Sequence, residues 1–182
     1  MIKRGDILLS EPFLGDPNFE RSAVLICEGN EEGHYGLVLN KPLENTKLSD
    51  VVDDVSAKGF QIYVGGPVEQ NVLQYVHTLG DVLPGAISIA EDVYLGGDYE
   101  KLKLLLDTGQ VKPSQIRFFI GYSGWSEGQL DGEMESNSWI VSNVKKIDLF
   151  EHEPDKLWRN VLRTMGGKYK AYSNYPIDPR LN

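Results

Sequence analysis

Cysteine is almost absent from this sequence of 182 residues, since Cys27 is the only one. A single thiol excludes an intramolecular disulfide and a structural zinc site built on several cysteines. Cys27 ends an apolar run that begins at Ala23, and Glu28 follows it directly. A reactive thiolate needs an electropositive and accessible setting, so the sequence predicts a buried structural thiol and argues against a nucleophile.

Long hydrophobic runs are lacking as well. The apolar run near the N-terminus, Ile7-Leu8-Leu9, is only three residues long. A secretory signal needs about 7–15 apolar residues and a membrane helix about 20. The sequence therefore predicts a cytoplasmic protein that makes no membrane contact.

Positive charge is scarce, because 18 Lys and Arg face 27 Asp and Glu, which gives a net charge of -9. The shortage is uneven: residues 156–182 carry six basic side chains against Asp178 alone, which leaves -14 on the rest of the chain. An acidic body repels nucleic acid, so direct nucleic-acid binding is disfavoured outside the basic C-terminal segment.

What the sequence does contain is typical of a globular protein, with 41% hydrophobic and 25% charged residues. No internal repeat, low-complexity tract or linker composition interrupts the chain, so we expect a single domain over residues 1–182. Residues 167–182 form a basic tail rich in tyrosine and proline. We expect this tail to order against the body or a partner.

Local patterns predict strands that come in runs and do not alternate regularly with helices. Strands are predicted at residues 7–9, 22–28, 34–40, 61–64, 73–79, 86–90, 117–122 and 139–144. Helices are predicted at residues 46–57, 99–108, shortly after 128, and 154–165. This arrangement favours an α+β fold, with a largely antiparallel sheet flanked by about four helices, over a doubly wound fold.

An ordered series of segments resembles a known family. The segments are Gly5–Pro12, Asp16–Ser22, Gly36–Pro42, Gly65–Val68, Gly96–Asp98, Arg117–Glu133, Trp139 and Leu157-Trp158. The most specific of them contains FFIGYSGWSEGQLDGE. In this order, from residue 5 to residue 158, they make the chain similar to the YqgE/AlgH family. The part beyond Met165 is not covered, and Gly132 stands where a helix former is expected.

The resemblance implies a compact bacterial α+β protein with a bent, partly barrel-like sheet. Some members are labelled transcriptional regulators, which associates the family with gene regulation and does not amount to a DNA-binding chemistry. The resemblance supplies no reaction.

Glycine gathers between residues 121 and 128, which makes this segment the best candidate for a site. A glycine-rich turn that enters a helix can present backbone N–H groups to phosphate. Four carboxylates lie close by without any Lys or Arg, and the glycine spacing matches neither the P-loop nor the dinucleotide fingerprint. The four are Glu127, Asp131, Glu133 and Glu135. The segment predicts a structural turn that seats Trp125, with a pocket for another kind of ligand left open.

Motifs for metals and nucleophiles are missing. His34, His77 and His152 are scattered, and the acidic segment fails the calcium-loop pattern. Ser123 misses the Gly-x-Ser-x-Gly spacing by one residue. We expect no metal, no cofactor and no catalytic set.

Six polar or aromatic residues of the family-like segments are candidates for a ligand site: Asp16, Arg21, Lys41, Trp125, Gln129 and Glu133. Arg21 and Lys41 flank the strands of a predicted hairpin, so they can converge at one end of the sheet and grip a carboxylate or carbonyl. In the structural alternative, Arg21 pairs with Asp16 across a turn and Lys41 follows the end of a strand.

The first hypothesis is a non-enzymatic regulatory module that binds a small molecule or a protein partner. An alternative is an enzyme that acts on a small molecule at a cleft shared by Arg21, Lys41, Gln129 and Glu133. This alternative requires the four side chains to meet around one concave pocket.

A second alternative is a nucleic-acid binder that uses residues 156–170. Lys156, Arg159 and Arg163 recur at i, i+3 and i+7, on one helix face that could follow phosphates. The sequence shows no helix-turn-helix pattern, and Trp158 indicates that the opposite face of this helix packs in the core. A solvated basic face, or one that docks on the acidic body, is the favoured interpretation; the sequence names neither a partner nor an oligomeric state.

Overall fold

The computed structural model describes residues 2–142, 149–150 and 153–177. His152, the end of the predicted strand 139–144 and the tail from residue 178 lie outside these ranges. The strands are β1 (Ile7–Ser10), β2 (Ala23–Asn30), β3 (Gly33–Val38), β4 (Pro42–Lys47), β5 (Gln61–Val64), β6 (Val68–His77), β7 (Ile87–Ala90), β8 (Val93–Leu95), β9 (Ile116–Ser126) and β10 (Trp139–Val141).

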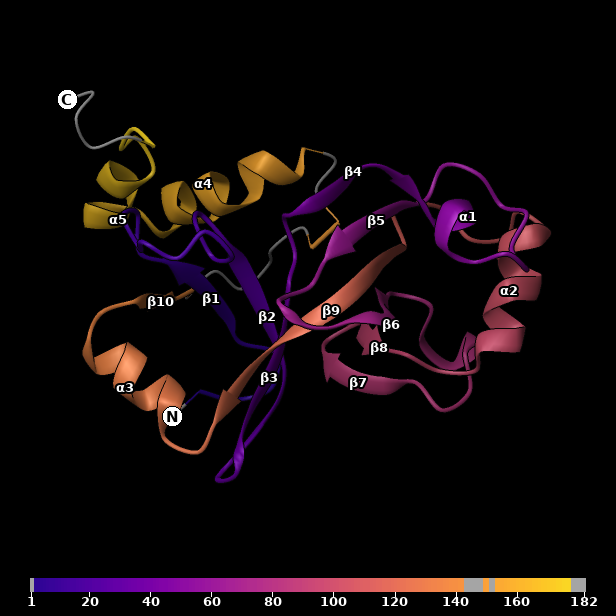
Figure 1. Ribbon diagram of the computed structural model, residues 1–182, viewed down its shortest axis with the longest axis horizontal. Helices are drawn as coiled ribbons and strands as arrows, with labels where there is room; N and C mark the ends of the chain where they lie inside the picture. The colour runs from indigo at the N-terminus through magenta and orange to yellow at the C-terminus, as the bar shows by residue number, and fades with distance from the viewer. Residues whose placement is uncertain (1, 143–148, 151–152, 178–182) are drawn as a thin grey trace.

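These strands form one sheet in the order β10-β1-β2-β3-β9-β6-β8-β7, while β4 pairs with β5 and β5 with β9 (Figure 1). The sheet does not close on itself, because β10 and β7 stand at its two ends. The pairing of β5 with β9 is parallel, and the other pairs are antiparallel. The predicted α+β class with a largely antiparallel sheet is confirmed.

The helices lie around this sheet. They are α1 (Leu48–Val51), α2 (Tyr99–Asp107), α3 (Gln129–Glu135), α4 (Pro154–Met165) and α5 (Gly167–Tyr172), with a 3-10 turn, η1 (Gly80–Val82). Asp98 caps α2 by accepting from the Lys101 N–H, and Pro154 opens α4, so both helices begin where they were predicted. In Figure 1, α4 and α5 cover one side of β1 and β2, and α3 lies on the other side. Within the described ranges, no helix is long and apolar enough to cross a membrane.

The two faces of β2 belong to different cores. Ala23, Leu25 and Cys27 pack in the cluster that includes the buried side of α4, whereas Val24 and Ile26 pack in the cluster that includes Trp125, Leu130 and Trp139. Alternate residues of a strand point to opposite faces, and both faces are covered here, so β2 is an almost continuous apolar run. Cys27 is buried as predicted, and burial raises its pKa to about 12.

The predicted helix over residues 46–57 is wrong, because only Leu48–Val51 is helical. The preceding residues form β4, which pairs with β5, and the Gln61 side-chain amide donates to the carbonyls of Leu43 and Thr46. Val51, at the end of this short helix, is 45% exposed. Pairing with a distant strand has overridden a weak local helix preference.

The glycine-rich segment is also different from its prediction. Residues 121–126 do not form a turn but continue β9, whose second half pairs with β3. Gly121 has φ +68, a conformation that favours glycine, at the point where the β6–β9 register shifts between the pairs Leu73–Ile120 and Val68–Tyr122. The turn itself is confined to Glu127 and Gly128. Strands β4 and β8 and helix α5 were not predicted.

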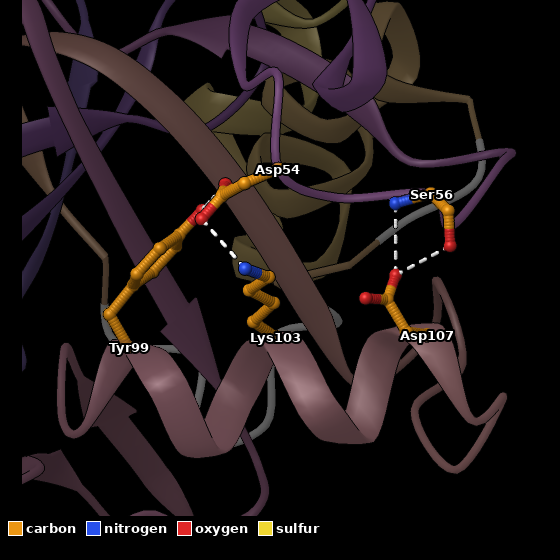
Figure 2. A network of polar contacts seen from close by, with 5 residues as sticks. All are labelled: Asp54, Ser56, Tyr99, Lys103 and Asp107. Carbon is orange, nitrogen blue, oxygen red and sulfur yellow. Dashed lines mark hydrogen bonds and ion pairs between the residues drawn. The ribbon is translucent and has the colours of Figure 1, made fainter.

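Two carboxylates tie α2 to the segment that precedes β5 (Figure 2). Asp54 accepts from the Tyr99 hydroxyl at 3.0 Å and from Lys103 Nζ at 2.9 Å, while Asp107 accepts from the Ser56 N–H and hydroxyl, both at 2.9 Å. The hydrogen bond from Lys103, and then that from Tyr99, lowers the pKa of Asp54. These contacts are exposed and position the segment on α2.

His77 on β6 is buried beside the rings of Tyr75 and Tyr94. Its Nδ1 accepts from the Leu79 N–H at 3.1 Å, so the neutral ring carries its proton on Nε2 and donates to the Gly96 carbonyl at 2.8 Å. Burial lowers the pKa of His77 below its usual 6.5.

We expect this histidine to make the fold less stable in mild acid. Because its pKa is lower in the folded state, the unfolded chain takes up the proton first as the pH falls below 6.5. The free energy of unfolding should therefore be constant above that pH and then fall by up to about 1.4 kcal/mol per pH unit. Urea titrations between pH 7.5 and 5.5 measure the slope. His77→Gln should flatten it, and an unchanged slope in His77→Gln contradicts the assignment.

Candidate functional site

Two tryptophans share one carboxylate on the α3 side of the sheet. Glu133 Oε2 accepts from the indole N–H of Trp125 at 2.8 Å and from that of Trp139 at 2.7 Å. The three residues come from β9, β10 and α3. Both indoles are almost fully buried and Glu133 is half-buried, so this carboxylate joins the two strands to the helix between them.

The entry into α3 holds Glu133 in place. Gly128, with φ +69, turns the chain from β9 into the helix. The Gln129 side-chain carbonyl accepts from the Ser126 N–H at 3.1 Å, and its amide donates to Glu133 Oε1 at 2.9 Å. Gln129 and Glu133 are one helical turn apart, so their side chains lie on the same face. Both carboxylate oxygens of Glu133 are therefore engaged.

A third aromatic ring comes from the loop between β1 and β2. Phe19 lies 6.3 Å from Trp125 and nearly parallel to it, and 5.4 Å from Trp139 at an interplanar angle of 77°. Asp16 organises this loop: its side chain accepts from the Asn18 N–H at 2.8 Å and its carbonyl accepts from the Phe19 N–H at 3.0 Å. Residues 16–19 therefore form a turn.

These side chains line a cavity of about 350 Å³. Its lining residues are Leu14, Asp16, Phe19, Pro67, Gly124, Trp125, Gln129, Glu133, Ser138 and Trp139. Two of them are carboxylates and none is Lys, Arg or His. Aromatic faces together with negative charge suit a small organic cation and repel an anion.

Arg21 and Lys41 lie elsewhere. The Arg21 guanidinium stacks 5.1 Å from the centre of the Trp158 ring, on the α4 side, and Nη2 donates to the Tyr175 carbonyl at 2.5 Å. Lys41 Nζ donates to the Glu20 carbonyl at 2.5 Å. Burial lowers the pKa of both side chains, and Arg159 lowers that of Arg21 further.

The structure thus divides the six predicted site residues into two groups. Asp16, Trp125, Gln129 and Glu133 line one cavity, whereas Arg21 and Lys41 lie at the open end of the β2–β3 hairpin, just before β2 and just after β3. Asn40, next to Lys41 in the chain, joins the two sides there, since its side chain donates to the Arg21 carbonyl at 2.8 Å and accepts from the Ala23 N–H at 2.9 Å. The Arg21–Asp16 pair of the structural alternative is not among the ion pairs of the described residues.

The basic face of α4 makes local contacts. Lys156 forms an ion pair with Glu153 at 2.6 Å, and Arg163 Nη2 donates to Asn174 Oδ1 at 3.4 Å. Part of the predicted tail packs on the body, because residues 167–172 form α5 and Tyr175 stacks on Phe13 at 5.5 Å. Nucleic-acid binding through this face stays a prediction.

Sequence reasoning missed two aromatic residues of the cavity wall, Phe19 and Trp139. Both lie in segments that carry the family resemblance, Phe19 in the loop between β1 and β2 and Trp139 at the first position of β10. Phe19, Trp125 and Trp139 come from three different family-like segments, and that was the signal in the sequence. Only strand pairing brings the three rings together.

Comparison with known proteins identifies relatives along the whole chain. A family model described as DUF179, AlgH-like, matches residues 7–170. A UPF0301 protein of Cytophaga hutchinsonii is 45% identical over 183 residues and covers 100% of both chains. A UPF0301 protein of Bacteroides thetaiotaomicron is 39% identical, over 98% of this chain and 91% of the relative. These names state no reaction or ligand.

Two solved structures have a similar fold. Protein DIP2367 from Corynebacterium diphtheriae has a TM-score of 0.76 at 24% identity, over 96% of this chain and 93% of its own. The AlgH protein from Pseudomonas aeruginosa has a TM-score of 0.70 at 24% identity, over 92% and 91%. At this identity the likeness extends to the fold alone.

Proposed function

The chain belongs to the AlgH-like family, whose names state no reaction. From the geometry of the cavity we propose that the protein is a non-enzymatic binding module. Its ligand site is the cavity lined by Phe19, Trp125 and Trp139, with Asp16 and Glu133 as its charged groups. The ligand is a small organic cation, such as a quaternary or primary ammonium compound. The single observation behind this proposal is the meeting of three aromatic rings and two carboxylates without a basic side chain.

The hydrogen bonds of the cavity favour binding over catalysis. A carboxylate has about four lone-pair positions, and Glu133 uses three of them for two indoles and the Gln129 amide. It is therefore a poor general base. Asp16 keeps Oδ2 without a partner among the described residues, so this oxygen is available to a cation. The enzyme alternative has less support, since Arg21 and Lys41 are not in the cavity wall.

A regulatory role fits a binding module better than a DNA-binding one. The body of the chain carries -14 when residues 156–182 are set aside, which disfavours direct contact with a duplex. Any link to transcription would then pass through the bound ligand or a protein partner. The basic face of α4 remains the place where a nucleic-acid contact would have to occur.

Choline and its neutral isostere 3,3-dimethyl-1-butanol test the site. The two have nearly the same shape, so only charge separates them. We expect choline to shift the NMR signals of the two indole N–H groups, with the isostere weaker by roughly 2- to 30-fold, which corresponds to about 0.5–2 kcal/mol.

Two substitutions provide the matched comparison. Phe19→Leu should weaken choline binding, whereas Phe13→Leu, which removes an exposed ring outside this cavity, should not. Equal affinities for choline and its isostere, or the same loss in both variants, would remove the proposal.

A further inference from the structure

In the part of the chain that the structure describes, strand β10 ends the sheet and bonds to β1 alone. The Glu11 N–H donates to the Ser138 carbonyl and the Ser142 N–H to the Ile7 carbonyl, both at 2.9 Å. In an antiparallel ladder every second residue bonds to the same neighbour, so Ile140 also faces β1 while Trp139 and Val141 present their backbone groups outward. Among the described residues, these outward N–H and C=O groups have no partner.

A groove of about 750 Å³ follows this strand. Six consecutive residues, 136–141, line it, and α5 contributes Lys168, Tyr169 and Tyr172 to its wall. Figure 1 shows β10 running between α5 and α3. Ile140 packs toward the α5 side, whereas Val141 packs toward the α3 side. An unpaired edge beside a groove is the arrangement in which extended peptides add to a sheet.

The charged groups of the groove wall are one cation, Lys168, and one carboxylate, Glu11. Helix α5 contains Lys168 and Lys170 and no acidic residue. Lys168 Nζ lies 5.2 Å from the centre of the Tyr169 ring and pairs with no carboxylate among the described residues. The acid in the groove wall, Glu11, already accepts from the Phe13 N–H at 2.8 Å. A cation without a partner beside a hydrogen-bonding edge favours a strand that carries carboxylates.

We propose that β10 binds an extended acidic segment of another protein as an additional antiparallel strand. The segment bonds to the outward N–H and C=O groups of Trp139 and Val141. Its side chains alternate between the two faces: those on the α5 side carry carboxylates that meet Lys168, and those on the α3 side are apolar and meet Val141 and Met134. The groove shares Leu14, Ser138 and Trp139 with the cation cavity, but the added strand bonds to backbone groups of β10 and not to the cavity's carboxylates.

A second copy of the chain fits this edge less well. Two copies that paired their β10 strands antiparallel would be related by a two-fold axis perpendicular to the sheet. That axis keeps the α5 helices on one face and sets them side by side. Lys168 and Lys170 would then face their own equivalents, and like charges at close range repel.

A fluorescein-labelled nonapeptide of alternating glutamate and valine is the probe, with a lysine–valine peptide as its control. The protein variant Val141→Pro removes an outward N–H and leaves the bonds to β1 intact, and proline is tolerated at such edge positions. We expect at least about a 10-fold weaker affinity by fluorescence anisotropy, with the far-UV circular dichroism spectrum unchanged.

Charge reversal gives a second test that is independent of the backbone. Lys168→Glu should lower the affinity for the glutamate peptide and raise the affinity for the lysine peptide. Lys170→Glu, which lies outside the groove wall, should change both affinities less. The proposal is overturned if Val141→Pro binds like the wild type, or if charge reversal leaves both affinities unchanged. It is equally overturned if sedimentation shows a dimer that Val141→Pro abolishes, because the occupant is then a second copy.

Discussion

Replacing Gly66 with alanine is expected to cost about 3 kcal/mol or more of folding free energy and to leave little native protein. An added Cβ would overlap the Tyr122 carbonyl and the Ser123 nitrogen. These are backbone atoms of β9, so no side-chain rotation can relieve the overlap. The β5–β6 connection lies this close to β9 because the Gly65 carbonyl accepts from the Val38 N–H at 2.8 Å and from the Ser123 hydroxyl at 3.0 Å. The β5–β6 connection, β3 and β9 meet at this point.

Two other glycines provide matched controls for this substitution. Gly59 has φ +93 with open space around its Cβ position, so Gly59→Ala should cost only about 1 kcal/mol, from backbone strain. Gly132 lies inside α3, also with open space, so Gly132→Ala should stabilise the protein by about 0.5–1 kcal/mol. Urea unfolding followed by far-UV circular dichroism measures all three. A Gly66→Ala protein as stable as Gly59→Ala would show that the two segments can move apart.

The second large effect is expected for Glu133→Ala, at about 2–4 kcal/mol. The substitution removes the acceptor for two buried indole N–H groups and for the Gln129 amide. A donor that loses its partner in a site of low exposure keeps its desolvation cost, which is larger than the net worth of the bond. The figure allows for water entering, because Glu133 itself is half-buried.

Substitutions at the same and a neighbouring position separate this effect from a loss of helix stability. Glu133→Gln keeps an acceptor oxygen and should cost about 1 kcal/mol, since charge-assisted bonds are roughly twice as strong as neutral ones. Glu135→Ala, exposed on the same helix, should change stability by less than about 0.5 kcal/mol. Thermal unfolding and the indole N–H signals report both. If all three variants were equally stable, Glu133 would have no structural role in holding the tryptophans.

Some elements could be predicted because their signals are local. Pro154 at the first turn and apolar residues at helical spacing define α4 to within its observed bounds. Asp98, as the N-cap, defines the start of α2. A cap or a proline acts on backbone groups only a few residues away, so it needs no knowledge of the rest of the fold. The burial of Cys27 and the β2–β3 hairpin belong to this class.

The candidate site could be predicted only in part. Gln129 and Glu133 share a helix face, and Trp125 lies in the most specific segment, so these were accessible from spacing. Phe19 and Trp139 reach the same cavity through β1, β2 and β10, whose pairing joins residues more than 100 positions apart. The same pairing sends Arg21 to the opposite face, onto Trp158.

The sequence by itself determined the α+β class, the helices α2 and α4, the buried thiol and the acidic character of the body. The tertiary structure alone decided that residues 121–126 are strand, that residues 42–47 pair with β5, and which side chains meet around Glu133. The physical reason is the range of the interactions. Caps, prolines and hydrophobic period act within a few residues, whereas the face on which a strand residue lies depends on a register set by partners far along the chain.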